Sequence, residues 1–535
     1  MEIAKDDVHR QLKAKVRLVR LLDTDKSHLV EEFTLICEVL ATEMCGDSLW
    51  LSSRLVSLWF GEFGKTNQIF LKYKRSLAKS TSLLNFFYQI VGRIGTFDIS
   101  KFVIECAINH PFVCVPAILQ LRSQTTPTGK QAEYILEKLR QNLSIQKIVA
   151  GLVGGFKFYL ALAMAKPPPV AASASRGHSL ERISGYSEYT KIVSAGHACV
   201  LTCTNSSLGV SSIASTYTVA DSGKSLPKIV QLTDTEGRVH RQIVKGNDDL
   251  RNDAILQQLF NILGVVRSYV VVPISAHAGI AEWVTGTVTM GNYLAGVDEQ
   301  FGAHHRYFPT DILPSEFKAR MVKARQQKES LVSIFSSQNF QPVLHFFFYE
   351  NWSSAETFFE AQSRYANSVA VTSVVGFVTG LGDRHPNNIL LDTVSGQVVH
   401  IDYGICFESG KFLKVPEIVP FRLTPDVVDG LGSLGVHGPF TRLCIDAMDS
   451  LKAKSALVTA IVEVCVVDPM FNWAVASLGS DNAVNALNAV VRKLQGFVNN
   501  ESLPLSTNAQ IDRLIRTATD PQNLALMFAG WQPWL

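Results

Sequence analysis

The side chains best suited to catalysis stand in GLGDRHPNNILLDTVSGQVVHIDYG, residues 380–404. Two strand-like runs, NILLD and VVHID, flank the turn-forming residues 393–396, which predicts a β-hairpin. Asn388 and Asp402 each lie seven residues from Ser395. In a symmetric register they would face one another, with Cβ atoms about 5 Å apart. An amide oxygen and a carboxylate at the open end of a hairpin suit a hard divalent cation such as Mg²⁺.

The loop before this hairpin supplies a candidate base. Asp383 precedes Asn388 by five residues and can reach the same place, where it would orient or deprotonate an attacking hydroxyl. His385 can hold that carboxylate or stabilise charge on a transferring phosphate. The alternative is a turn with solvated carboxylates and a packed core histidine. The glycines and arginine of residues 380–384 crowd the same loop and favour the catalytic interpretation.

Phosphoryl transfer also needs a cation on the nucleotide phosphates. Lys245 ends the strand-like run RQIVK, and Asp248 and Asp253 on the following predicted helix could hold it. Upstream, Ser222 and Gly223 form a turn between strands that could fold over phosphates, although it matches neither GxGxxG nor a Walker A loop. For Lys245 alone, a solvated lysine at a strand end is the simpler alternative.

The elements that must position these residues change in character along the chain. Residues 1–165 carry apolar side chains at helical spacing, and a linker rich in Pro, Ala and Ser follows. The runs KIVSAGHACVLTCTN, PKIVQLTDTEGRVHRQIVKG and VVRSYVVVPISAHAGIAEWV predict an antiparallel sheet, interrupted by a helix at 248–263. From about residue 286 helices dominate again. The predicted fold class is α+β, with a small β-rich lobe, a larger helical lobe and a ligand cleft between them.

Composition and charge exclude several classes of protein. Lys and Arg number 50 against 47 Asp and Glu, and the formal charge of +3 is too balanced for a nucleic-acid coat. Nine scattered cysteines without a CxxC pair indicate a reduced, intracellular protein. The N-terminus lacks the apolar core of a secretory signal. Residues 148–165 approach membrane-spanning length, but the central Lys157 and three glycines favour a helix packed inside a helical domain.

Several motifs in one order carry a family resemblance. Asp-Arg-His-x-x-Asn followed by His-Ile-Asp-x-Gly, with Lys-Gly-x-Asp-Asp-Leu-Arg-x-Asp upstream, resembles the phosphatidylinositol 3-kinase-related protein kinases. Residues 185–535 are strongly similar to the ataxia-telangiectasia-mutated (ATM) type, and residues 55–165 resemble the end of a helical FAT region more loosely. The matching segments are KGNDDLRNDAILQQLF, AEWVTGTVTMGNYL, GAHHRYFPTD, SSQNFQPV, VPFRLTPDVVDGLG, VEVCVVDPMFNW and, as a FATC tail, TNAQIDRLIRTATDPQNLALMFAGWQPWL.

The resemblance implies a role for individual residues. Asp383 would be the catalytic aspartate, supported by His385, and Asn388 and Asp402 would hold Mg²⁺ or Mn²⁺. Lys245 would hold the phosphates of ATP. The remaining ATP contacts would be Ser222 and Gly223 over the phosphates, Asp248, Asp253 and Tyr269 around the lysine, the hinge backbone at Glu282 and Val284, and the side chains of Trp283, Leu390 and Ile401 around adenine.

The family architecture also implies domain limits. Residues 1–165 would be the end of a FAT-type helical region, 166–182 a linker, 183–285 the kinase N-lobe and hinge, 286–505 the C-lobe with a short regulatory insert, and 506–535 the FATC-like tail. The aromatic residues Phe528, Trp531 and Trp534 would pack against the catalytic lobe and not form an exposed patch. Tyr403 stands where the family usually has Leu or Phe, and it keeps an apolar ring.

The implied activity is transfer of the ATP γ-phosphate to Ser or Thr followed by Gln, in DNA-damage (double-strand break) checkpoint signalling in the nucleus. The implied partners are such protein substrates, an activator complex that senses DNA ends, and a second copy in a full-length homodimer, without direct membrane association. These kinases are normally thousands of residues long, so this chain would be a fragment, a truncated gene model or a naturally reduced kinase.

Two other functions stay open. A phosphoinositide lipid kinase shares Asp-Arg-His and the hairpin, but it needs a basic activation segment, and residues 403–420 offer only Lys411 and Lys414. A catalytically inactive scaffold would be favoured if the lysine, the aspartates or the asparagine of the site were replaced. All of them are intact.

Overall fold

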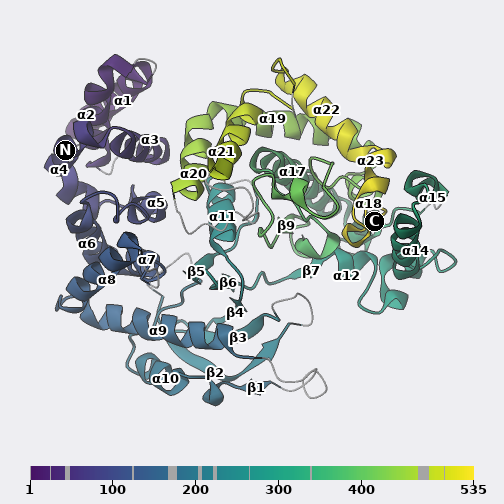
Figure 1. The fold of residues 1–535 in the computed structure, drawn as a ribbon, viewed down its shortest axis with the longest axis horizontal. Coiled ribbons are helices and arrows are strands. Elements are labelled where there is room, and N and C mark those ends of the chain that lie inside the picture. The colour runs from purple at the N-terminus through teal and green to yellow at the C-terminus, as the bar shows by residue number, and fades with distance from the viewer. Residues whose placement is uncertain are drawn as a thin grey trace. The chain divides into compact units, whose positions relative to one another are not determined.

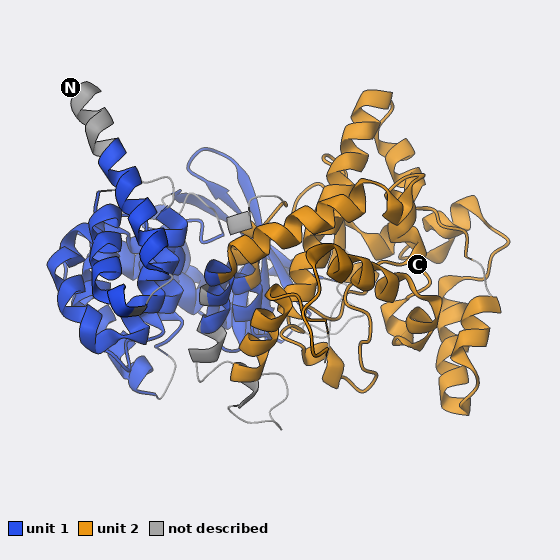
Figure 2. Ribbon diagram, turned by 90° about the horizontal axis from the view of Figure 1, so that it is seen from above, with its two compact units in different colours: residues 1–255, 269–283, 456–471 blue, residues 256–268, 284–455, 472–535 orange. Residues whose placement is uncertain are grey.

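A computed structural model describes most of the chain, as two compact units that Figure 2 colours separately. Unit 1 comprises residues 1–255, 269–283 and 456–471, and unit 2 comprises residues 256–268, 284–455 and 472–535. The described residues are 2–23, 26–42, 48–122, 126–166, 177–202, 208–220, 226–263, 266–337, 340–467, 481–498 and 501–535.

Unit 1 begins with the helical region, which runs from purple to blue in Figure 1. Its apolar side chains lie on the inner faces of amphipathic helices: Trp59 and Phe70 are buried and stack with ring centroids 3.6 Å apart. The helices predicted for residues 1–165 are confirmed. They are α1 (Glu2–Leu22), η1 (Lys26–His28), α2 (Leu29–Leu40), α3 (Ser48–Gly61), α4 (Phe63–Lys79), η2 (Leu84–Phe86), α5 (Phe87–Val91), α6 (Ser100–Asn109), α7 (Pro111–Leu119), α8 (Pro127–Arg140) and α9 (Gln146–Met164).

The predicted antiparallel sheet is also part of unit 1, with strand order β1-β2-β3-β4-β6-β5. The run PKIVQLTDTEGRVHRQIVKG forms β3, a turn and β4, and in the turn Asp234 Oδ1 accepts the N–H groups of Glu236 and Arg238 at 2.8 and 2.9 Å. The elements are β1 (His178–Ser179), η4 (Leu180–Arg182), α10 (Tyr186–Ser194), β2 (Val210–Val219), β3 (Lys228–Asp234), β4 (Val239–Gly246), β5 (Val271–Ser275), β6 (Ala278–Glu282) and, from later in the chain, α20 (Ser455–Val467). Helix α11 (Arg251–Leu263) begins in unit 1, and its residues from 256 onward belong to unit 2.

Two local predictions around this sheet were wrong. KIVSAGHACVLTCTN was predicted as a strand, but its first residues end α10, because Tyr189 and Val193 are buried at helical spacing. The helix predicted from residue 248 begins at Arg251. Asp249 accounts for the later start, since its Oδ1 accepts the N–H of Arg251 at 3.1 Å in a local turn.

Helix α9 joins the helical region to the sheet within unit 1. It is long and apolar enough to cross a membrane, and 56% of its apolar window is buried. Its glycines permit close packing: a Cβ at Gly151 would lie 1.9 Å from His197 O, and one at Gly154 would lie 2.2 Å from Ile192 Cδ1. The prediction of a helix packed against other helices is confirmed, and α9 also packs against β4, β5 and β6.

Unit 2 is built around α17, whose residues 368–379 are all buried. It packs along α19 and against β9 of a small sheet with strand order β7-β8-β9. The elements up to the small sheet are β7 (Thr287–Thr289), α12 (Met290–Leu294), η5 (Glu299–Phe301), α13 (Ala303–Tyr307), α14 (Pro314–Gln327), α15 (Leu331–Ser337), α16 (Leu344–Asn351), α17 (Ala355–Thr379), η6 (Pro386–Asn388), β8 (Ile389–Asp392) and β9 (Val398–His400). Those after it are η7 (Ser409–Phe412), α18 (Pro425–Gly430), η8 (Gly435–His437), α19 (Pro439–Ala453) and α21 (Asp481–Leu494).

The C-terminal tail packs into unit 2 as α22 (Thr507–Thr519), α23 (Pro521–Leu526) and η9 (Ala529–Trp531). Trp531 and Trp534 are each 3% exposed, so their predicted packing is confirmed. For Phe528 the prediction was wrong, since this residue is 54% exposed. Its ring covers the outside of the last turn: a Cβ at Gly530 would lie 2.3 Å from Phe528 Cε1.

The predicted domain limits stay predictions. Of the proposed linker, residues 167–176 lie outside the described residues. So do residues 468–480, which overlap the start of the regulatory insert predicted at about 474–506. Within the insert, α21 is described and packs against α17 and α19.

Candidate active site

Helix α17 leads into the loop that carries the candidate catalytic residues. The helix closes at Gly380, which adopts a φ of +61°, a conformation that glycine reaches without steric cost. A Cβ there would also lie 2.5 Å from Glu408 N. The glycine therefore ends the helix sharply, and residues 381–385 run free of regular structure into η6 and β8.

Asp383 is held by its backbone on both sides. Its φ of +55° is uncommon for a residue with a Cβ and costs about 1–3 kcal/mol. Glu417 Oε1 accepts its N–H at 2.8 Å, and its carbonyl oxygen accepts a hydrogen bond from Asn388 Nδ2 at 2.9 Å. The Asp383 side chain is 45% exposed. Its carboxylate is thus both fixed in direction and open to a substrate.

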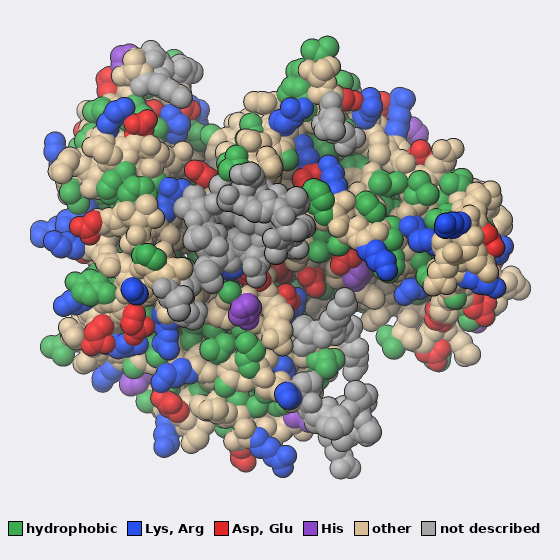
Figure 3. All heavy atoms as spheres, viewed as in Figure 1, with side chains coloured by type: hydrophobic (Ala, Val, Ile, Leu, Met, Phe, Trp, Pro, Cys, Tyr) green, Lys and Arg blue, Asp and Glu red, His purple; other side chains and the backbone are tan. Residues whose placement is uncertain are grey.

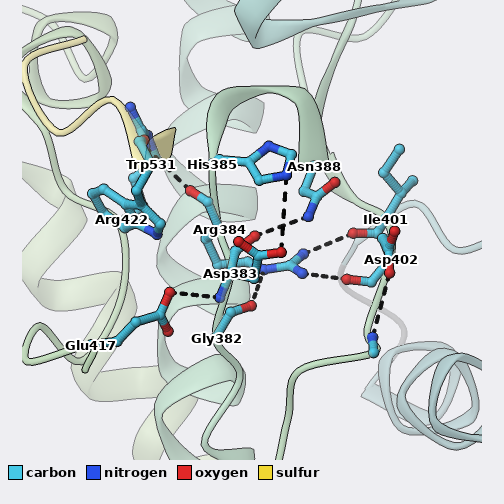
Figure 4. A network of polar contacts seen from close by, with 11 residues as sticks. Gly382, Asp383, Arg384, His385, Asn388, Ile401, Asp402, Glu417, Arg422 and Trp531 are labelled. Atoms are coloured by element: carbon cyan, nitrogen blue, oxygen red, sulfur yellow. Dashed lines mark hydrogen bonds and ion pairs between the residues drawn. The ribbon is translucent and has the colours of Figure 1, made fainter. Parts of the chain in front are cut away.

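His385 lies beside this carboxylate, as predicted, with its Nε2 4.0 Å from Asp383 Oδ2 (Figure 4). Burial lowers the pKa of His385, and the charges of Arg384 and Arg422 lower it further, against the opposing effect of Asp383. The imidazole therefore favours its neutral form, which has one N–H to donate.

The predicted hairpin forms, but its predicted register was wrong by one residue. Ile389 pairs with His400, so Asn388 faces Ile401, whose N–H donates to Asn388 O at 3.0 Å. Asp402 is not opposite Asn388. It lies past the end of β9, with a φ of +60° that bends the backbone away from the strand.

The turn of the hairpin explains the shift. Asp392 Oδ1 accepts the N–H groups of Val394 and Ser395 at 2.8 and 2.9 Å, and Gly396 N donates to Asp392 O at 2.9 Å. The loop that this network closes centres between Val394 and Ser395, not on Ser395. A shift of one residue changes every cross-strand neighbour.

A buried arginine brings the separated residues together. Arg384 is 3% exposed, and its Nε donates to Gly382 O and its Nη1 to Ile401 O, both at 2.8 Å. Its Nη2 donates to Asp402 O. Figure 4 shows Asp383, Asn388 and Asp402 gathered around this guanidinium. The sequence indicated Arg384 only as a neighbour in the loop; its place between Asp383 and His385 was the available signal.

Asn388 and Asp402 offer oxygen ligands that fit a divalent cation. Asn388 is 7% exposed, and because its Nδ2 binds Asp383 O, its amide oxygen faces away from that bond (Figure 4). Asp402 Oδ1 is 3.5 Å from Gly404 N. Amide and carboxylate oxygens suit Mg²⁺, which completes its shell with water and phosphate oxygens. Over the described residues, no group of three or more His, Cys, Asp or Glu side chains could hold a metal.

Glu417 is a site residue that the sequence reasoning missed. Besides binding Asp383 N–H, it closes against the loop: a Cβ at Gly382 or Gly410 would lie 2.4 or 2.5 Å from Glu417 Oε2. Burial raises the pKa of Glu417 to about 7 despite the hydrogen bond from Asp383 N–H. A lone Glu in the apolar run LKVPEIVPF was the only hint. Glu417, Gly382 and Lys493 of α21 also line a cavity of about 570 Å³.

Tyr403, the unusual residue after Asp402, is buried with hydrogen-bond partners for its hydroxyl. Its ring is 1% exposed, and its hydroxyl donates to His400 O at 2.7 Å and accepts from Gln257 Nε2 at 3.1 Å. The buried hydroxyl therefore has both a donor and an acceptor partner.

The predicted phosphate-binding lysine belongs to unit 1. Lys245 lies near the end of β4, opposite Gly279 of β6, and its Nζ is 3.3 Å from Asp248 Oδ2. Asp253, in the first turn of α11, and Tyr269, ahead of β5, are both buried. Their predicted roles around the lysine stay predictions. Ser222 and Gly223 lie outside the described residues.

The predicted hinge residues have definite backbone partners. Glu282 N donates to Val270 O at 2.9 Å, and its carboxylate accepts Val270 N–H at 3.0 Å, so its carbonyl is the backbone group it could offer adenine. Trp283 N donates to Arg241 O at 3.0 Å.

The other predicted adenine contacts belong to unit 2. Val284 O accepts the Thr287 hydroxyl at 2.8 Å, so its N–H is the group that it could offer. Leu390 is 8% exposed in β8, and Ile401 follows β9.

Comparisons with known proteins found matching domain families, curated relatives and solved structures. Two family models match: phosphatidylinositol 3- and 4-kinase over residues 241–475, and the FATC domain over residues 504–535. Curated relatives include Serine-protein kinase ATM of Sus scrofa, 37% identical over 366 residues (58% of this chain, 12% of the relative). Tel1 of Schizosaccharomyces pombe is 31% identical over 563 residues (90% of this chain, 19% of the relative). The chain matches the kinase and FATC domains of phosphatidylinositol 3-kinase-related kinases and is similar to their ATM type.

Solved structures extend the similarity over the whole chain. The FAT and kinase domain of CtTel1 superposes with a TM-score of 0.82 at 27% identity, covering all of this chain and 39% of the other. The complete CtTel1 dimer gives the same TM-score and identity, with 21% of that chain covered. The predicted fold class is confirmed: an α+β kinase of this family, with a FAT-type helical region before it and a FATC tail after it. The chain spans less than a fifth of the two curated relatives above.

Proposed function

We propose that this chain is the catalytic portion of an ATP-dependent serine/threonine protein kinase that modifies Ser or Thr followed by Gln. The observation that carries the proposal is the grouping of Asp383, Asn388 and Asp402 around the buried Arg384. Relatives that are named serine/threonine-protein kinases support protein, not lipid, as the acceptor.

The exposed Asp383 carboxylate would orient the substrate hydroxyl and accept its proton as the oxygen attacks the γ-phosphorus. The neutral His385 would donate its N–H to a phosphoryl oxygen. Asn388 and Asp402 would hold Mg²⁺ or Mn²⁺, which supplies charge neutralisation for the β- and γ-phosphates when bound. Lys245 would hold the same phosphates.

For the nucleotide base, we propose contacts with those backbone groups of Glu282 and Val284 that are not already used in the hydrogen bonds described above. The Glu282 carbonyl would accept from the adenine amino group and the Val284 N–H would donate to a ring nitrogen. Leu390, Ile401 and Trp283 would contact the ring faces. Asp248, Asp253 and Tyr269 would order the lysine, and Ser222 and Gly223 would cover the phosphates.

A phosphoinositide kinase is the second candidate, because the family model that matches residues 241–475 is that of phosphatidylinositol 3- and 4-kinases. Its headgroup phosphates would need cations from the activation segment. Lys411 there is engaged with Glu408, which leaves Lys414 as the other lysine between residues 403 and 420. The activation segment therefore favours a protein acceptor.

One assay separates the candidates. The purified chain is given labelled ATP with Mg²⁺ or Mn²⁺ and, in parallel, a Ser-Gln peptide, its Ser-Ala counterpart and phosphatidylinositol vesicles. We expect label on the Ser-Gln peptide alone. Label on the lipid would replace the proposal with a lipid kinase, and equal labelling of both peptides would remove the Gln requirement. No transfer to any acceptor would favour an inactive scaffold.

We further propose that the full-length protein acts in nuclear DNA-damage signalling as a homodimer with an activator that senses DNA ends. The CtTel1 and Tel1 relatives are described as symmetric dimers. Figure 3 shows acidic and basic side chains interspersed on the viewed face, which fits recruitment to DNA through a partner. Light scattering of the full-length protein tests the dimer, and a monomeric mass at micromolar concentration would contradict it.

A further inference from the structure

A second buried arginine, Arg422, lies behind the catalytic loop. It is 3% exposed, and four backbone oxygens accept its hydrogen bonds. Its Nη1 donates to Trp531 O at 2.7 Å and to Arg384 O at 3.2 Å. Its Nη2 donates to Gln532 O at 2.8 Å and to Leu535 O at 2.6 Å. One guanidinium thus holds the C-terminal tail and the catalytic loop together (Figure 4).

The buried surroundings of this guanidinium leave it little freedom to move. Burial lowers the pKa of Arg422 to about 9, although the nearby Asp426 opposes the change. No carboxylate in the described part of the chain accepts a hydrogen bond from it, and its Nε has no hydrogen-bond partner there. The Trp531 ring lies against it, 4.5 Å from centroid to Cζ. A buried charge whose hydrogen bonds all go to carbonyl oxygens, with a ring against it, depends on those groups staying in place.

The carbonyl that Arg422 holds lies at the centre of the site. Arg384 O belongs to the peptide bond between Arg384 and His385, and Arg384 directly follows Asp383 in the chain. The side chain of the same Arg384 holds Gly382 O, Ile401 O and Asp402 O. The two arginines therefore connect the tail to the backbone on both sides of Asp383 and to the backbone of Asp402.

We propose that Arg422 is a positioning residue for phosphoryl transfer. Its hydrogen bonds to Trp531 O, Gln532 O and Leu535 O anchor the guanidinium. From there it fixes the Arg384 carbonyl and, through this carbonyl, the directions of Asp383 and His385. The tail would thereby be part of the catalytic apparatus without touching substrate. This inference rests on the proposed kinase function.

The chain offers a matched control. Arg325 of α14 also donates to tail backbone oxygens, with its Nη2 2.7 Å from Leu526 O and 2.9 Å from Met527 O. Its hydrogen bonds go to α23 and the residue after it, not to the catalytic loop. The tail is anchored there in addition by apolar packing of Leu524 and Met527 with Phe335 and Val419. Loss of Arg325 tests the effect of a loosened tail alone.

The experiment compares Arg422→Lys, Arg422→Met and Arg325→Lys in the 535-residue chain. Lysine keeps the charge but cannot span four acceptors with its single ammonium. Because small misplacements of a catalytic group are costly, we expect Arg422→Lys to lower kcat on the Ser-Gln peptide about 10–100-fold. The KM for ATP should change little. Hydrogen exchange should become faster at residues 382–386. Arg325→Lys should leave kcat and exchange at 382–386 unchanged.

A second variant covers the case in which both Arg422 changes prevent folding. Deleting residues 532–535 removes two of the four acceptors and leaves the arginine in place, and it should produce the same loss of kcat and the same faster exchange. A folded Arg422→Lys protein with wild-type kcat, or with wild-type exchange at 382–386, overturns the inference, as does an equal loss in Arg325→Lys. If the wild type transfers phosphate to no acceptor, the proposed function fails, and the exchange comparison still decides whether Arg422 orders the loop.

Discussion

The catalytic loop of unit 2 and the lysine of unit 1 are held in contrasting ways. The loop is fixed through its backbone by two buried arginines, a glutamate and an asparagine. Lys245 forms an ion pair with Asp248, three residues on, and the two side chains are 15% and 31% exposed. Near-surface pairs of this kind contribute about 0–1 kcal/mol.

The difference matches the tasks proposed for the two regions. A base and metal ligands act through direction and distance, so their errors cost rate steeply. A lysine that neutralises phosphates acts mainly through charge, which falls off gently with distance. The loop should therefore be sensitive to small geometric changes, and the lysine to loss of charge.

The largest effect is expected from removing the loop carboxylates. Asp383→Ala takes away the base and Asp402→Ala takes away a metal ligand, so each should lower kcat on the Ser-Gln peptide by about 10³-fold or more. The control is Asp446→Ala, which removes an exposed carboxylate of α19 paired with Arg442 and should leave kcat unchanged. Wild-type kcat in either loop variant contradicts the assignment.

A smaller effect is expected at the lysine. Lys245→Met should raise the KM for ATP about 10-fold or more, because a charge on the phosphates is lost. Lys245→Arg should retain most of the affinity, and Asp248→Asn should change KM less than about threefold, since the pair is weak. Lys65→Met, which breaks an exposed pair with Glu62 at the same spacing, is the control. Loss of activity in Lys245→Arg as severe as in Lys245→Met would erase the contrast between the regions.

The raised pKa of Glu417 should give the loop a pH dependence. With a folded pKa of about 7 against an ordinary 4.5, the folded protein keeps a proton that the unfolded chain has lost. The contribution of Glu417 to stability is thus present below pH 4.5 and is lost as pH rises through 7. In Glu417→Gln, the fall in Tm between pH 5 and 8 should be shallower by about 2–4 °C. A wild-type slope would show that the group titrates normally.

The smallest effect on activity is expected inside unit 1. Tyr159 of α9 donates its hydroxyl to Gln242 Oε1 at 2.5 Å, and Gln242 Nε2 donates to Thr202 Oγ1 at 2.8 Å. Tyr159→Phe leaves a buried acceptor unpaired, which should cost about 1–3 kcal/mol of unfolding free energy. Denaturant unfolding measures this cost, and kcat below the transition should be unchanged. A fall in kcat would mean that the hydrogen bond between Tyr159 and Gln242 also positions the chemistry.

The parts of the molecule that sequence could predict are those that local pattern controls. Helical spacing gave the helices of residues 1–165, and two β-branched runs around a turn gave the hairpin. The register was missed because it depends on Asp392 capping its own turn. The α10 segment was missed because its apolar residues fit a strand until tertiary packing buries Tyr189 and Val193 on one helical face.

Within the site, residue types revealed Asp383, Asn388 and Asp402 because their chemistry is unusual in one short segment. Arg422 and Glu417 could not be found in this way. Both act on backbone groups, and any sequence presents those groups at every position. Only the path of the chain shows which carbonyl or N–H comes within reach.

The grip of Arg422 on main-chain oxygens has a consequence for how the tail can change in evolution. The hydrogen bonds of Arg422 do not involve the side chain of Gln532. The φ of +50° at this position would suit glycine at least as well as glutamine. The backbone path of the tail and the aromatic ring that lies against Arg422 must be retained. Tails of quite different amino-acid sequence can therefore complete the same catalytic loop, provided that their backbone follows the same path.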